Sequence, residues 1–155
     1  MSWNTEIVTI VRHLIDDTDF SNPRYPDERI EQTILVAAQL IQTELNFETT
    51  YSINVEECHL SPDPTLSEDK DDGFINLTAL KAAVIVVSAE YRSYGLSSVK
   101  VTDGPSSIDM TNAATHMKHL YDTLSDRYEQ YKINFASANN NVGKAILSPY
   151  GNWRQ

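Results

Sequence analysis

The sequence predicts a mainly α-helical fold: a four-helix bundle with a small β-hairpin, a long acidic loop and an extended C-terminal arm. Three observations predict it. Apolar residues recur at steps of three and four in four segments. Asp103-Gly104 separates two short alternating runs, which favours a hairpin. Residues 61–73 and 139–155 fit neither pattern. At 155 residues the chain suits one domain, so we expect a helical domain over 1–138 and an arm over 139–155.

The first two helices follow from their apolar spacing. The first is expected over 4–16, with one face formed by Ile7, Ile10, Val11 and Leu14. Turn-forming residues 17–23 end it. The second opens at Pro26, a favoured first-turn residue, and its stripe consists of Ile30, Ile34, Ala37, Ile41 and Leu45. Such a stripe requires another helix across from it.

A strand and a loop are expected next. Tyr51, Ile53 and Val55 alternate with polar residues, which predicts a short half-buried strand. Residues 61–73 contain two prolines and a run of charges, so we expect a long acidic loop there.

The third helix is the most apolar and is expected to run from a cap at Asn76 to Gly95. Its apolar face comprises Leu80, Val84, Val87, Tyr91 and Tyr94, widened by neighbouring residues. A helix that is apolar over most of its girth belongs in the centre of a bundle. The apolar stretch 77–89 contains Lys81 and is too short to span a bilayer, so we expect no membrane association.

The hairpin is expected over 99–110, where it needs support from its own domain or from a neighbour. A fourth helix is expected over 112–138, about 40 Å long. We expect the first half of this helix to lie in the core. The aromatic residues of its far end, Tyr128, Tyr131 and Phe135, are either core or a surface for another subunit, which tyrosine suits.

The C-terminal arm is rich in apolar residues that a disordered tail normally avoids. We expect it to dock on a partner, the alternative being that it folds back on its own bundle. The residues expected to bind a partner are Val142, Ile146, Leu147, Tyr150, Trp153 and Arg154.

The formal charge of −10 is unevenly distributed. Residues 1–75 carry 16 acidic and 4 basic side chains, whereas residues 76–155 carry 6 and 8. Such a chain repels phosphate, which disfavours tight nucleic-acid binding. The acidic surface is either a solvated face or a surface that meets a basic partner or repels DNA. The single cysteine excludes an internal disulfide, and the first residues do not resemble a secretory signal, so we expect a soluble protein.

No pattern in the sequence indicates catalysis. His116 and His119 have a spacing that can bind a metal, but no motif marks a third ligand. Cys58 and His59 are adjacent and therefore poorly placed as nucleophile and base. A calcium loop aligned on Gly73 has a lysine in place of a ligand. We therefore expect no enzyme, no catalytic residue, no metal and no cofactor.

The order of these elements resembles the head-to-tail adaptor (connector) proteins of tailed bacteriophages. The residues that carry the resemblance are the first helix with Val11 to Asp17, the entry to the second helix with Tyr25 to Ile30, and the hairpin from Val99 to Met110. It covers most of the chain. The long loop 61–73 departs from the family pattern.

The resemblance implies a structural virion protein of the phage neck, assembled in the host cytoplasm. Such adaptors form a ring, usually of twelve copies, that joins the portal to the tail or to the next neck protein. Their C-terminal arms reach the portal, which would suit Val142 to Gln155. DNA passes through the lumen without specific binding, and an acidic wall would keep it from sticking. The alternatives are another neck or tail-completion protein, a cytoplasmic helical regulator that binds a partner protein, and an enzyme that uses His116 and His119 with a metal.

Overall fold

The computed structural model describes residues 2–19, 21–66, 70–97, 102–103, 106–107 and 111–139. The fold is mainly helical, with two short antiparallel strand pairs. In chain order the elements are α1 (Trp3–Leu14), α2 (Asp27–Glu44), β1 (Ser52–Asn54), β2 (His59–Ser61), α3 (Asp72–Ser97), β3 (Thr102–Asp103), β4 (Ser106–Ser107) and α4 (Thr111–Asn139).

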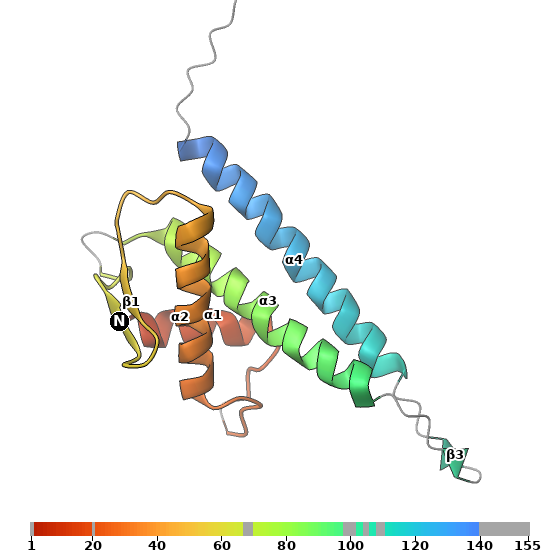
Figure 1. Cartoon of the computed structure of the whole chain (residues 1–155). Helices are drawn as coiled ribbons and strands as arrows, with labels where there is room; N and C mark the ends of the chain where they lie inside the picture. Colours follow the sequence, from red (N-terminus) through yellow and green to blue (C-terminus); the bar gives the residue numbers. More distant parts are fainter. Residues whose placement is uncertain are drawn as a thin grey trace, which may run out of the picture.

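Helix α3 is the central element, as its composition predicts. It contacts each of the other three helices. Helices α1 and α2 cross it near its start, whereas α4 lies along another side of it (Figure 1). The other three helices thus pack on α3, but α1 and α2 run across it rather than beside it.

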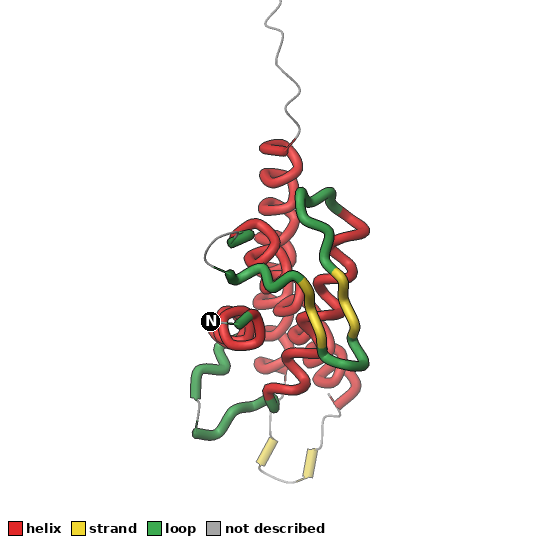
Figure 2. Tube along the Cα trace, turned by 90° about the vertical axis from the view of Figure 1, so that its left-hand side faces the viewer, coloured by secondary structure: helices red, strands yellow, loops and turns green. Residues whose placement is uncertain are grey.

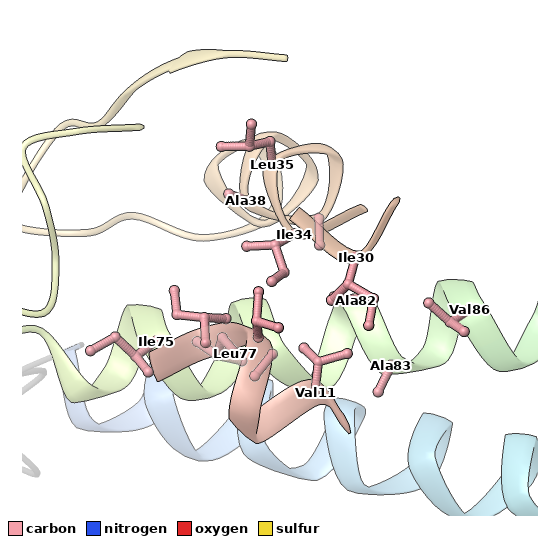
Figure 3. Close-up of a cluster of buried hydrophobic side chains, with 14 of the residues drawn as sticks. Val11, Ile30, Ile34, Leu35, Ala38, Ile75, Leu77, Ala82, Ala83 and Val86 are labelled. Carbon is pink, nitrogen blue, oxygen red and sulfur yellow. The ribbon is translucent and has the colours of Figure 1, made fainter. Parts of the chain in front are cut away.

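The core lies where α1, α2 and α3 meet. Ile30 and Ile34 point from α2 toward α3, and Val11 of α1 joins them (Figure 3). The small side chains of Ala82 and Ala83 are fully buried on α3, which lets the crossing helices approach closely.

The face assigned to α3 from the sequence is partly wrong. Val87 is buried, but Leu80, Val84 and Tyr91 are only half-buried. The fully buried side chains include Leu77 and Phe74, and Phe74 packs on Phe47 and Tyr51 of the segment between α2 and β1. Because α3 is apolar on most sides, its neighbours decide which residues are covered.

Helix α3 begins four residues earlier than the expected cap at Asn76. The Asp71 carboxylate accepts a hydrogen bond from the backbone N–H of Phe74 at 2.9 Å, so Asp71 caps the helix. The segment Asp72–Ser93 is long and apolar enough to cross a membrane, with a mean hydropathy of 1.5, which corrects the expectation that it is too short. Half of that segment is buried inside the protein, as a core helix is.

Two hairpins accompany the helices (Figure 2). The expected strand near Tyr51 exists as β1 and pairs with β2, which the sequence did not predict, with Ile53 opposite Leu60. The predicted hairpin over 99–110 appears as β3 paired with β4. Its expected strand residues 99–101 and 108–110 lie outside the described residues.

The described part of the expected acidic loop is attached to α1. Pro64 and Thr65 are buried. The Asp63 carboxylate accepts a hydrogen bond from the backbone N–H of Trp3, and Lys70 Nζ lies 2.7 Å from Glu6 Oε1. The Asp63 carboxylate thereby satisfies a donor of the first turn of α1, which has no side-chain cap of its own.

Candidate docking surface on helix α4

Four side chains from three helices fasten the end of α4 to the body of the protein. We call Glu44, Lys81, Tyr128 and Lys132 the Glu44 junction. The Tyr128 hydroxyl donates to Glu44 Oε2 at 2.6 Å, and Lys81 Nζ donates to Glu44 Oε1 at 2.7 Å. Lys132 Nζ lies 3.5 Å from Glu44 Oε2. Both ammonium groups also lie over the Tyr128 ring, at 4.6 and 5.3 Å from its centre.

The electrostatics of the junction favour an ionised Glu44. Desolvation raises the pKa of its carboxyl, but the hydrogen bonds from Lys81 and Tyr128 and the nearby positive charges outweigh this, so the pKa is lowered overall. The pKa of Tyr128 is raised by burial and by its hydrogen bond to Glu44. The phenol therefore stays neutral and keeps donating.

An aromatic cluster holds the next turns of α4. The Phe135 ring lies 5.0 Å from that of Phe47, which meets Phe74 edge-on at 5.3 Å. Tyr51 stacks on Phe74 at 3.9 Å. Gly73 makes this possible, because a Cβ there would lie 2.5 Å from Phe135 Cε2.

The three predicted surface residues of α4 fall into different environments. Tyr128 is only 3% exposed and belongs to the core of this chain, so its side chain is not available to a partner. Phe135 is half-buried in the aromatic cluster. Tyr131 is 38% exposed, and its hydroxyl accepts a hydrogen bond from Asn76 at 3.3 Å. The expected docking residues of the arm, Val142, Ile146, Leu147, Tyr150, Trp153 and Arg154, lie outside the described residues.

The sequence analysis missed the most exposed large hydrophobic side chain of the described residues, Ile133, which is 61% exposed. On α4 it lies away from the stripe that contains Tyr128 and Phe135. Its position outside that stripe was the available signal, since an apolar residue off the core-facing stripe of a surface helix points to solvent.

Beyond α1 and α2, α3 and α4 continue as an antiparallel pair that leads to β3 and β4 (Figure 1). The rings of Tyr91 and Tyr121 stack there, with their centres 6.5 Å apart. Val84 and Met117 remain half-buried. Two helices alone cover their apolar side chains incompletely, so this part of the surface is also suited to a contact.

A cleft of about 320 Å³ lies between α1 and the start of α2. Buried Arg12 lines it and donates to the Asp17 carboxylate, to the Tyr25 carbonyl at 2.8 Å and to Asp27 at 2.6 Å. The other Asp17 oxygen accepts the backbone N–H of Arg24. These bonds hold the turn between α1 and α2, so the guanidinium is engaged within the protein.

The candidate ligands named from the sequence are dispersed. His116 and His119 are exposed, and within the described ranges no three His, Cys, Asp or Glu side chains converge on a possible metal site. Cys58 lies in the turn before β2, with a φ of 51°, rather than on a strand. Burial, followed by its hydrogen bond to Glu31, raises the pKa of its thiol. Such a thiol is a poor nucleophile.

Comparison of the chain with protein-family models, with curated proteins and with solved structures finds no match. Any assignment of function therefore depends on the sequence pattern and on the surfaces described above.

Proposed function

We propose that this chain is a structural virion subunit, a head-to-tail adaptor that forms a ring in the phage neck between the portal and the tail or the next neck protein. The observation that carries the proposal is the position of α4. This long helix is fastened along one side, by the Glu44 junction and the aromatic cluster, and it leaves Tyr131 and Ile133 exposed at its end. A helix held in this way can present a rigid surface to a neighbouring protein.

The finer features of the expected fold belong to the same proposal. In an assembled ring, helices of neighbouring copies complete the bundle around the exposed side of α4 and the pair of α3 and α4. Residues 139–155 continue from the end of α4 and serve as the docking arm for the portal. The acidic N-terminal half faces the DNA path and repels it. No cofactor and no catalytic step take part.

The proposal is tested by locating the protein in the particle that contains it. Electron microscopy of that particle should place a ring of this chain between portal and tail, and the chain should co-purify with the portal protein. A variant that lacks Val142 to Gln155 should keep its helix content and melting temperature but lose portal binding. A chain found elsewhere in the cell, as a monomer bound to a non-virion protein, would instead favour a regulator.

A further inference from the structure

Helix α4 contributes little to the buried core of the described chain. Although it spans 29 residues, it supplies two of the buried hydrophobic side chains, Leu124 and Tyr128. Helix α1, with 12 residues, supplies four, and α2, with 18 residues, supplies six. The other three helices therefore form a body with a core of its own, and α4 lies along one side of that body (Figure 1).

The contacts of α4 with the body are also one-sided. Among the described elements, α4 packs extensively on α3 alone, whereas α1 and α2 pack on each other and on α3. Three pairs of residues mark the antiparallel register of α3 and α4: Gly73 with Phe135, Asn76 with Tyr131, and Tyr91 with Tyr121. Outside α3, Glu44 of the junction and Phe47 of the aromatic cluster hold α4. Release of α4 would leave the contacts among α1, α2 and α3 in place.

We propose that α4 opens away from the body as one unit while α1, α2 and α3 stay folded. The free energy of local opening varies across a protein, and elements with few buried apolar contacts open at the lowest cost. The closed form is the major one, because the Glu44 junction and the aromatic cluster hold α4 in place. The open form is a minor species in equilibrium with it. This property goes beyond the proposed function and does not depend on it.

Opening uncovers an apolar stripe on α3. Gly73, Asn76 and Tyr91 of α3 meet side chains of α4. Leu80 and Val84 lie between them at helical steps of three and four residues, which places them on the same side of α3. Both are half-buried in the closed form and pack against the core. The open form therefore presents to solvent an apolar face that the closed form covers.

Hydrogen exchange of the full chain, followed by mass spectrometry, tests for this opening. Under conditions in which exchange reports the opening equilibrium, amides of residues 121–131 should be protected at least about tenfold less than the best-protected amides of α2, because α4 opens without global unfolding. The protection should be similar throughout 121–131, since the helix opens as one unit.

A conservative change in the core of the body separates opening of α4 from global unfolding. Ile34 points from α2 toward α3 and is fully buried (Figure 3). Ile34→Val should speed exchange of the best-protected α2 amides about two- to tenfold. Amides of residues 121–131 should keep their wild-type rates, because the contacts of Ile34 are intact in both the closed and the open form. Val11→Ala, in the core-facing side of α1, should give the same separation.

A change in the Glu44 junction separates opening as a unit from fraying of the helix end. Tyr128→Phe removes the hydroxyl that donates to Glu44 at 2.6 Å in the closed form. All amides of residues 121–131 should then exchange at least about tenfold faster, including those that precede Tyr128. The best-protected α2 amides should speed up by a similar factor, because global unfolding breaks the same hydrogen bond.

Three results would each overturn the inference. Equal protection of α2 and α4 in the wild type would mean that α4 opens only when the body unfolds. Equal acceleration of both helices by Ile34→Val and by Val11→Ala would mean the same. Unchanged exchange of residues 121–127 in Tyr128→Phe would show that α4 frays from its end. Each of these results leaves the proposed function unaffected.

Discussion

The contribution of the Glu44 junction to stability can be measured by removing one oxygen atom, that of the Tyr128 hydroxyl. Tyr128→Phe keeps the buried ring and its contacts with Lys81 and Lys132 but removes the hydroxyl that donates to Glu44 at 2.6 Å. A buried hydrogen bond to a charged group contributes about 1.5–3 kcal/mol. Glu44 keeps Lys81 at 2.7 Å, so the carboxylate is not left unpaired. We therefore expect a loss at the lower end, about 1.5–2 kcal/mol of unfolding free energy.

Tyr131→Phe is the matched control on the same helix. Its hydroxyl accepts a longer hydrogen bond, 3.3 Å from Asn76, and the residue is 38% exposed, against 3% for Tyr128. A surface change of this kind alters stability by less than about 0.5 kcal/mol. Urea unfolding followed by circular dichroism at 222 nm compares the two variants with the wild type. For a chain of this size, about 1.5–2 kcal/mol corresponds to a fall of roughly 3–8 °C in melting temperature.

The reasoning about α4 is refuted if the two variants lose equal stability, or if Tyr128→Phe loses none. Either result would mean that the hydroxyl of Tyr128 does not fasten α4 to α2 more strongly than an exposed hydroxyl does. An unchanged m-value in both variants would show that the comparison concerns the same unfolding transition.

Three further predictions concern other contacts. Because the pKa of Glu44 is lowered in the folded state, its pairing stabilises the fold above the unfolded pKa of about 4.3, and this contribution is lost as pH falls through the folded pKa. Glu44→Gln should therefore melt at a lower temperature than the wild type at pH 7, and the two melting temperatures should converge in acid. A difference in melting temperature that stays constant with pH would contradict this. Gly73→Ala should lower the free energy of unfolding by about 1–3 kcal/mol, because the added Cβ would lie against Phe135. In a double-mutant cycle, Phe135→Leu should relieve much of this loss. Additive effects of the two substitutions would show that the two residues do not meet. Arg12→Leu leaves buried Asp17 without its counter-charge and should lose about 3–5 kcal/mol in urea unfolding. Arg24→Leu removes a half-exposed cation that lies 3.6 Å from Glu90 and should lose less than about 1 kcal/mol. Similar losses would contradict the linking role of Arg12.

The helices could be predicted because their signals are local. Apolar spacing located α1, α2 and α4 to within two residues of their observed ends. The start of α3 could not be located in this way, since Asp71 and Asn76 are both good caps. The burial of Phe74, which lies before Asn76, decides between them, and it depends on Phe47 and Tyr51.

The candidate site could be predicted only in part, because the exposure of its residues depends on contacts with residues that are distant in the sequence. Tyr128, Tyr131 and Phe135 share one stripe in the sequence, and nothing local indicates which of them is exposed. Tyr128 is buried at a site where its hydroxyl donates a hydrogen bond to Glu44, 84 residues away in the sequence. The strand β2 was missed because three residues carry too short a pattern, and its pairing with β1 requires the turn at Cys58.

The Glu44 junction links the stability of the chain to its proposed assembly. Leu40 precedes Glu44 by one turn on α2, and Ile133 follows Lys132 directly on α4, so the residues that fasten the two helices stand beside exposed apolar side chains. The position of α4 relative to α2 is therefore set by contacts inside each subunit. Because closure of a ring depends on that relation in every copy, a small shift of α4 in each subunit changes the rotation between neighbours. A variant that loosens the junction without changing Tyr131 or Ile133 should then alter the size distribution of the assemblies, even where the subunit remains folded.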